Sequence, residues 1–194
     1  GAIDRLGKVE NGTTTCDFDP EETKRMVSVS SAVAPLEWNN TKVNVIDTPG
    51  SFDFATGMYE GIRAAGSVII VVSARSGVNV GTEKAYKYCQ KKNMPNLFVV
   101  TKIDEENGDF MKVYTALRQQ FGMRVCALTY PVIGNGKVMG MIDLLKMTYR
   151  TVEGNLGLRV SATGIPEAVG SKAVLRMMDK DYGLTPSDVD DYVE

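Results

Sequence analysis

The chain has 194 residues, of which 43% are apolar, enough for one packed domain with at most a small appendage. Its 22 basic and 24 acidic residues give a net charge of −2, so this segment has no basic bias that would indicate nucleic-acid binding. The absence of histidine excludes Cys/His zinc sites and catalytic histidines, and three scattered cysteines favour reduced thiols over a disulfide framework. No apolar run approaches a membrane span and no signal peptide is evident, so we expect a cytoplasmic protein without membrane contact.

The first quarter of the chain predicts a loop and two strands. Residues 1–24 are polar and rich in turn formers, which predicts a loop. Residues 26–34 alternate in polarity and predict an exposed or edge strand. Residues 42–47 are apolar and β-branched, so we expect a buried strand that pairs antiparallel with its predecessor across the turn at Asn39 and Asn40. This second strand stops abruptly at Asp47, Thr48, Pro49 and Gly50.

Helices and apolar strands then alternate. A rough helical stripe with two internal glycines covers residues 52–65, and residues 67–74 predict a second buried strand. A helix is expected over residues 82–92 with Thr82 as its N-cap, followed by a third strand over residues 97–100. That strand stops at Thr101, Lys102, Ile103 and Asp104, and a last helix over residues 109–121 ends at Gly122. This order predicts an α/β domain with a mostly parallel sheet.

The character of the sequence changes after about residue 130. Gly134, Asn135 and Gly136 predict a hairpin, with strands over residues 137–144 and 147–152. Helices are expected over residues 166–180 and again after Thr185. We therefore divide the chain at residues 1–130 and 131–194, and expect the second part to be a small α+β appendage.

Two tetrapeptides that end buried strands carry the chemistry. In a parallel sheet both fall on the carboxyl edge, where open α/β folds bind ligands. Asp47 has two common uses at such a position, because it can cap the next turn or face a metal ion and phosphates. A glycine in that turn lets a backbone N–H approach a phosphate closely. Lys102 and Asp104 could lay an aliphatic stem along a purine and accept two donors that guanine offers and adenine does not.

These motifs carry a family resemblance. The DTPG run with Ser51, Phe52, Asp53 and Phe54 after it, together with the TKID run at residues 101–104, resembles translational GTPases, specifically the G domain of elongation factor G and its paralogues. Residues 25–29, 73–78, 82–83 and 140–144 resemble further segments of that family. The resemblance covers roughly residues 1–150. It implies a P-loop-NTPase-type G domain with helices on both faces of the sheet, binding GTP or GDP with Mg²⁺.

The resemblance also implies roles for individual residues. Ser28 stands at the family's Mg²⁺-binding threonine, so Ser28 and Asp47 are the implied metal ligands. Ser51 stands at the position of the histidine that positions the attacking water, and it is the implied catalytic position. The implied nucleotide-binding residues are Asp47, Thr48, Pro49, Gly50, Ser51, Thr101, Lys102, Ile103 and Asp104.

Several features depart from the family pattern. No G-x-x-x-x-G-K-[ST] phosphate loop occurs in the sequence, so we expect that loop and the first strand to precede residue 1, and the ribosome-contacting domains to follow residue 194. Met26 replaces a glycine of the first switch segment. The guanine-edge motif of the form S-A-[KL] has only faint counterparts at residues 126–128 and 161–163. Residues 1–130 are thus expected to be a partial G domain with both switch segments, and residues 131–194 part of an inserted subdomain.

The functional expectation is the GTP-binding part of an elongation-factor-G-like GTPase that acts on the ribosome in translocation. The alternatives are a ribosomal protection or recycling GTPase, a GTP-binding module that does not hydrolyse, and an inactive fragment. The intact protein is expected to hydrolyse GTP, whereas this chain alone should be inactive. An uncovered sheet centre would also favour self-association of the chain.

Overall fold

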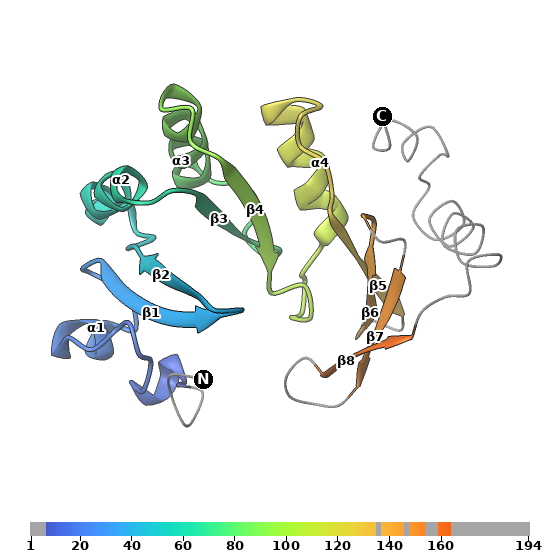
Figure 1. Cartoon of the computed structure of the whole chain (residues 1–194), viewed down its shortest axis with the longest axis horizontal. Coiled ribbons are helices and arrows are strands. Elements are labelled where there is room, and N and C mark those ends of the chain that lie inside the picture. The colour runs from blue at the N-terminus through green and yellow to red at the C-terminus, as the bar shows by residue number, and fades with distance from the viewer. Residues whose placement is uncertain (1–6, 135–136, 146–147, 154–158, 164–194) are drawn as a thin grey trace. The chain divides into compact units, whose positions relative to one another are not determined.

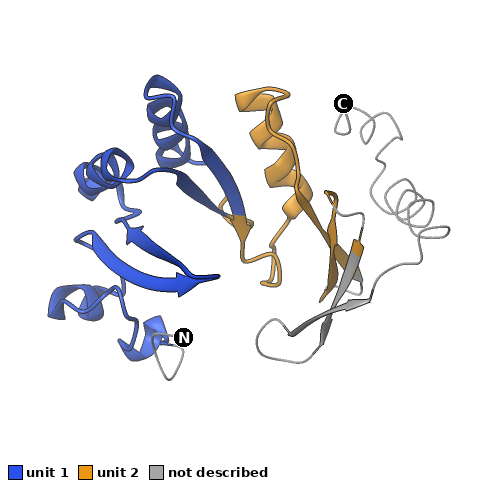
Figure 2. Cartoon of the chain, viewed as in Figure 1, with its two compact units in different colours: residues 1–72, 78–99 blue, residues 73–77, 100–194 orange. Residues whose placement is uncertain are grey.

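The structure is a computed structural model that describes residues 7–134, 137–145, 148–153 and 159–163. It divides into two compact units, one of residues 1–72 and 78–99 and the other of residues 73–77 and 100–194 (Figure 2). In chain order the elements are η1 Val9–Asn11, α1 Pro20–Arg25, β1 Ala32–Trp38, β2 Thr41–Asp47, η2 Phe52–Phe54, α2 Ala55–Ala64, β3 Val68–Ser73, α3 Val80–Lys91, β4 Asn96–Thr101, α4 Phe110–Phe121, β5 Thr129–Gly134, β6 Lys137–Asp143, β7 Thr148–Glu153 and β8 Arg159–Thr163 (Figure 1).

The expectation of a loop over residues 1–24 was wrong for its last part, where the short helix α1 begins at Pro20. Helix α1 has a complete capping box, in which the Asp19 carboxylate accepts from the backbone and the Glu22 carboxylate accepts from the Asp19 N–H. Pro20 occupies the first turn, where its missing N–H costs nothing. The polar composition of this stretch therefore encodes a helix start as well as turns.

Strands β1 and β2 pair antiparallel, as predicted, from Ala32 opposite Asp47 to Trp38 opposite Thr41. The connecting residues Asn39 and Asn40 both have positive φ angles of 47° and 57°, which a tight hairpin turn requires. The first strand starts at Ala32 rather than at residue 26, because the N–H groups of Val29 and Ser30 donate to Glu22 of α1 instead of to a strand partner.

The expected burial of the second strand was wrong. Val43 and Val45 are 39% and 44% exposed, and only Ile46 in this strand is half-buried. Strand β2 belongs to a two-stranded sheet among the described residues, and a two-stranded ribbon has too little neighbouring surface to bury both faces.

Strands β3 and β4 form a second two-stranded sheet, and both run from the first unit into the second. The Val68 N–H donates to Pro95 O and the Ala74 N–H donates to Thr101 O, a constant offset that makes the pair parallel. One face is covered, because Ile70 and Val72 are buried. The other face is open, and the strand that was expected to be buried leaves Ile69 and Val71 more than 60% exposed.

The helices of the first unit pack through small and apolar side chains, with Ile62 of α2 and Ala85 and Cys89 of α3 buried. Helix α3 starts at Val80, two residues before the expected start. Its N-cap is Asn79, whose Oδ1 accepts from the Thr82 N–H at 2.9 Å, so the expected N-cap Thr82 lies inside the helix. Asparagine is among the preferred N-cap residues, and it competes directly with threonine for this position.

The second unit contains α4 and an antiparallel sheet in the order β5-β6-β7-β8. Helix α4 ends at Gly122 as predicted and buries Val113, Tyr114 and Leu117 along one stripe. The predicted hairpin is confirmed by the pairing of β5 with β6, although Asn135 and Gly136 themselves lie outside the described residues. The helices expected over residues 166–180 and after Thr185 also lie outside the described residues. Among the residues that are described, no helix is long and apolar enough to cross a membrane.

Candidate functional site

The turn after β2 is built by close packing. Asp47 is the last residue of the strand and is exposed, Thr48 is half-buried and Pro49 is buried. Helix α2 packs against this turn through its two glycines. A Cβ added at Gly61 would lie 2.5 Å from Cγ2 of Thr48, and one at Gly57 would lie 3.1 Å from Cδ of Pro49. The glycines, which weaken the helix by propensity, are needed because no side chain fits between α2 and this turn.

Ser51 follows the turn and serves as the N-cap of η2. Its backbone is extended, with φ −74° and ψ 141°, and its hydroxyl makes no capping hydrogen bond. The next residue, Phe52, is 64% exposed, and the Lys84 ammonium lies 4.0 Å from the centre of its ring. The implied catalytic position is therefore an exposed serine, followed in the chain by an aromatic residue whose ring contacts a lysine.

Ser28, the first implied metal ligand, is held by an acidic side chain that the sequence did not single out. Its hydroxyl donates to Oδ1 of Asp17 at 2.7 Å, and the Thr14 hydroxyl donates to Oδ2 of the same carboxylate at 3.2 Å. Ser28 is half-buried. Asp17 and Ser28 are eleven residues apart, and no periodic pattern connects them, so this contact was accessible only from the structure.

A buried carboxylate organises the same segment. Glu22 is 1% exposed and its Oε1 accepts from the N–H groups of Val29 and Ser30, both at 2.9 Å. These backbone hydrogen bonds, from Ser30 first and then Val29, hold the pKa of the Glu22 carboxyl below its usual range. In the same segment, three residues before Val29, Met26 adopts a left-handed backbone conformation with φ 56°. This is the position where the resemblance implies glycine, which adopts that conformation without steric cost.

Asp47, the second implied metal ligand, interacts with the neighbour of Asp17. Cys16 is half-buried, and its thiol hydrogen-bonds to the Asp47 carboxylate. Burial first, and then the negative charge of Asp47, raises the pKa of the Cys16 thiol above its usual value. The adjacent residues Cys16 and Asp17 thus contact Asp47 and Ser28 respectively, which brings both implied metal ligands to one short loop.

The two implied metal ligands, Ser28 and Asp47, are both oxygen donors, the kind of ligand that Mg²⁺ prefers. Within the described residues, no three carboxylate, thiol or imidazole side chains gather closely enough to hold a metal ion. Mg²⁺ prefers oxygen ligands and is commonly held by one or two protein oxygens together with nucleotide phosphates and water. The Asp47 carboxylate and the Ser28 hydroxyl are oxygen donors of that kind.

The loop after β4 has a different construction. Thr101 ends the strand, and Lys102 takes a left-handed backbone conformation with φ 59°. The Asp104 side chain is exposed. Glu105 binds two cations, with its Oε2 3.3 Å from an Arg75 guanidinium nitrogen and its Oε1 3.7 Å from the Lys102 ammonium. The sequence pattern identified Lys102 and Asp104 but provided no reason to select Glu105 or Arg75.

The faint guanine-edge candidates remain unassigned by the geometry. Cys126 is exposed in the segment before β5, and residues 161–163 belong to β8. Neither is linked to another predicted site residue by a described contact. They stay predictions without structural support.

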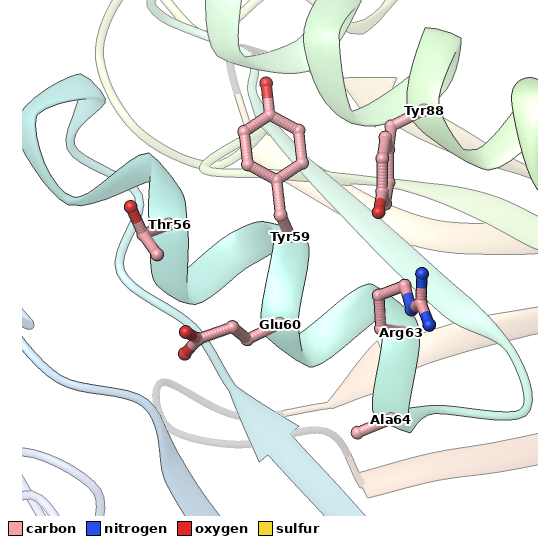
Figure 3. A pocket seen from close by; sticks show the side chains of 6 residues that line it. All are labelled: Thr56, Tyr59, Glu60, Arg63, Ala64 and Tyr88. Atoms are coloured by element: carbon pink, nitrogen blue, oxygen red, sulfur yellow. The ribbon is translucent and has the colours of Figure 1, made fainter.

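A shallow depression lies on another surface of the first unit (Figure 3). The Tyr59 and Tyr88 rings meet there edge to face, with 4.8 Å between their centres. The residues that line it are Thr56, Tyr59, Glu60, Arg63, Ala64 and Tyr88. None of these lining residues belongs to the predicted nucleotide-binding residues. The depression is therefore not the candidate nucleotide site.

Comparison with known proteins identifies the family. The model of the elongation factor Tu GTP-binding domain matches residues 1–182. Elongation factor G 1 of Syntrophomonas wolfei subsp. wolfei is 30% identical over 166 residues, covering 86% of this chain and 25% of that protein. An elongation factor G-like protein of Mycobacterium tuberculosis is 35% identical over 168 residues, covering 86% of this chain and 23% of that protein.

A solved structure agrees with these sequence matches. The crystal structure of a protein from Thermus thermophilus matches 99% of this chain and 29% of that chain, with a TM-score of 0.76 and 29% identity. The chain spans about a quarter of the length of the curated relatives it matches. The predicted α/β G-domain fold is confirmed by this likeness. The chain therefore belongs to the elongation factor Tu GTP-binding domain family, and the relatives it matches include elongation factor G and elongation factor G-like proteins.

Proposed function

We propose that this chain contributes the guanine-specific and metal-facing parts of a GTP site in an elongation-factor-G-like GTPase. The observation that carries the proposal is the family match over residues 1–182. In this proposal Asp47, Thr48, Pro49, Gly50 and Ser51 face the phosphates, and Thr101, Lys102, Ile103 and Asp104 face the base. The turn after β2 and the loop after β4 each follow the carboxyl end of a strand, which is where α/β folds bind nucleotides.

Asp104 is proposed to read the base. Its exposed carboxylate can accept two hydrogen bonds, and guanine presents two donors on one edge. Lys102 would lie against the purine through its aliphatic stem. Adenine lacks that pair of donors, so it would leave the Asp104 carboxylate desolvated and unpaired, which costs binding free energy.

We propose that the oxygens of Ser28 and Asp47 would hold Mg²⁺ when a nucleotide is bound. When bound, the ion would neutralise charge that develops on the phosphate oxygens. Asp47 would offer its carboxylate, and Ser28 would offer hydroxyl lone pairs because its proton is donated to Asp17. Asp17 and Cys16 would keep these two ligands in place before the ion arrives.

At the level of the whole protein, we propose a cytoplasmic elongation factor that hydrolyses GTP on the ribosome during translocation. The names of the relatives, elongation factor G and elongation factor G-like protein, support this role. A ribosomal protection or recycling GTPase is the alternative within the family. Residues 1–130 would be a partial G domain, and residues 131–194 part of an inserted subdomain, in keeping with the antiparallel sheet that starts at β5.

Ser51 favours a second candidate, a module that binds GTP without rapid hydrolysis. The position carries a hydroxyl held close to the backbone, and the chain contains no histidine. We further propose that the isolated chain self-associates, because one face of the β3-β4 sheet exposes the apolar side chains Ile69, Val71, Leu97 and Val99.

Replacement of Asp104 tests the proposed guanine recognition. In the full-length protein, Asp104→Asn should weaken GTP binding by roughly 10- to 100-fold, since a bidentate pair with a base contributes about 1–3 kcal/mol. Asparagine offers one acceptor and one donor, which suits xanthine, so affinity for XTP should rise. Calorimetric titration with GTP and XTP measures both changes. An unchanged preference for GTP would show that Asp104 does not read the base.

A further inference from the structure

Lys102 is held in a backbone conformation that lysine rarely adopts. Its φ angle of 59° lies in the left-handed region, which is sterically unfavourable for a residue with a Cβ. Such strain persists only where the surroundings impose it, and it collects at binding loops. The surroundings of Lys102 therefore reveal what its conformation is for.

The backbone around Lys102 closes tightly on itself. The Gly108 N–H donates to Glu105 O at 2.9 Å, and the Asp109 N–H donates to Ala74 O at 3.3 Å. A Cβ at Gly108 would lie 2.4 Å from the Lys102 carbonyl oxygen. The loop over residues 102–108 thus fixes the position of the Lys102 backbone and leaves its long side chain to be oriented by other groups.

Glu105 supplies that orientation. One of its carboxylate oxygens lies 3.7 Å from the Lys102 ammonium, and the other lies 3.3 Å from Arg75. Arg75 belongs to the turn after β3. The turn is closed by a hydrogen bond in which the Gly77 N–H donates to Ser73 O. Glu105 is therefore tethered to the end of the neighbouring strand while it pairs with Lys102.

The pairing also decides which carboxylate neutralises Lys102. Asp104 is two residues from Lys102, and as a carboxylate it is a competing partner for the ammonium. In the described residues the ammonium is paired with Glu105 and Asp104 makes no ion pair. Because a lysine pairs with one carboxylate at the expense of another, Glu105 leaves both oxygens of Asp104 available as acceptors.

We propose that Glu105 is a positioning residue for base recognition. Tethered by Arg75, it holds the Lys102 ammonium away from Asp104, so that the lysine stem is preset to lie along a purine and the Asp104 carboxylate stays open to the two guanine donors. The proposal rests on the proposed function of this loop. It assigns Arg75 and Glu105 to the specificity of the site although neither need touch the nucleotide.

Acylation of Lys102 tests the proposal on the 194-residue chain without requiring tight nucleotide binding. The chain is treated with a limiting amine-acylating reagent, and the modified fraction of Lys102 is measured by peptide mass spectrometry. Glu105→Gln should raise the rate at Lys102 roughly two- to fivefold, the range expected on losing an exposed ion pair. Glu106→Gln is the matched control, because Glu106 is an exposed neighbour that makes no ion pair in the described part of the chain. Equal rates in the two variants would overturn the proposal.

The same reaction run with millimolar Mg·GDP or Mg·ADP separates the proposal from the function on which it rests. In the unaltered chain GDP should protect Lys102 more than ADP does, and Glu105→Gln should narrow that difference. If GDP protects the unaltered chain and the Glu105→Gln variant equally, Glu105 does not position the lysine and the proposal falls alone. If GDP gives no more protection than ADP in the unaltered chain, both the proposed guanine recognition and the role of Glu105 in it are wrong. Far-ultraviolet circular dichroism checks that both variants retain the fold.

Discussion

The turn after β2 and the loop after β4 follow strands in the same way but are held in place by different forces. The turn depends on shape, because Pro49 is buried and Thr48 lies against a glycine of α2. The loop depends on charge, because the Lys102 side chain is 53% exposed and is held by a carboxylate shared with Arg75. Exposed ion pairs are screened by salt, whereas packing between uncharged groups is not screened. If the proposed roles hold, the groups that face the phosphates have a rigid support and the groups that face the base have an adjustable one.

The largest effect that we expect from a single substitution is on the rate of GTP hydrolysis, at Ser51, which follows the packed turn after β2. In the full-length protein, Ser51→His should raise the rate of GTP hydrolysis by roughly 10²–10⁴, the usual contribution of a positioned acid–base side chain. The serine hydroxyl is too short to reach the point that an imidazole would occupy. Single-turnover hydrolysis, with and without ribosomes, measures the effect. If the serine form is already as fast as the histidine form, some other group positions the water and the slow binding module is excluded.

The close packing between α2 and the turn after β2 can be tested by a substitution at Gly61. In Gly61→Ala the new methyl would meet the Thr48 side chain, and overpacking of this kind costs about 1–3 kcal/mol. Alanine gains back up to about 1 kcal/mol of helix propensity, so the net effect is a loss of unfolding free energy. Urea denaturation measures the change. Gly66→Ala is the control, since no atom lies within 4 Å of its added Cβ, and equal stability of the two variants would contradict the packing account.

A third segment, which contains Val29 and Ser30, is held in place by a buried charge rather than by packing or by an exposed ion pair. The Glu22 carboxylate has a lowered pKa in the folded chain, so it stabilises the segment above its unfolded pKa of about 4.3 and loses that effect as the pH falls through the folded value. We expect the Val29 and Ser30 amides to be protected from hydrogen exchange near neutral pH and to lose protection as the pH falls through the lowered pKa of Glu22. NMR-detected exchange measures this protection.

The matched pair of variants for this segment is Glu22→Gln and Glu21→Gln. Glu22→Gln should reduce the protection of both amides even near neutral pH, because a neutral amide is a weaker acceptor for two N–H groups. Glu21 is exposed in the same helix and does not contact these amides, so its replacement should leave them protected. Similar loss in both variants would mean that α1 as a whole, and not the buried carboxylate, holds the segment.

Local sequence patterns predicted the elements of this fold better than their burial. The alternation of apolar strands with helices, the hairpin at Asn39 and Asn40 and the end of α4 at Gly122 were read correctly, because each depends on residues close in sequence. The burial of residues 42–47 was read wrongly. An apolar β-branched run shows that a segment can be buried, but not whether neighbours on both faces are present to bury it.

Short motifs in the sequence were enough to select candidate site residues, whereas contacts between residues far apart in the chain were accessible only from the structure. Asp47, the last residue of β2, and Asp104, three residues after β4, were selected because each lies in a recognisable tetrapeptide at the end of a strand. Asp17, Cys16, Glu105 and Arg75 were missed, because each matters through a partner whose distance along the chain follows no periodic rule. The assignment of roles to the motif residues remains a prediction that binding experiments must test.

The most direct test of the account is an NMR titration of the isotope-labelled chain with Mg·GDP and, separately, with Mg·ADP. No phosphate-loop motif occurs in this sequence, so binding should be weak and visible only at millimolar nucleotide. Amide signals of Asp47, Thr48 and Gly50 should shift with both nucleotides, which share their phosphates, whereas those of Lys102 and Asp104 should shift with GDP alone. Absence of any shift in these residues, or an equal response of Lys102 and Asp104 to ADP, would contradict the claim that this chain carries the guanine-recognising part of a GTP site.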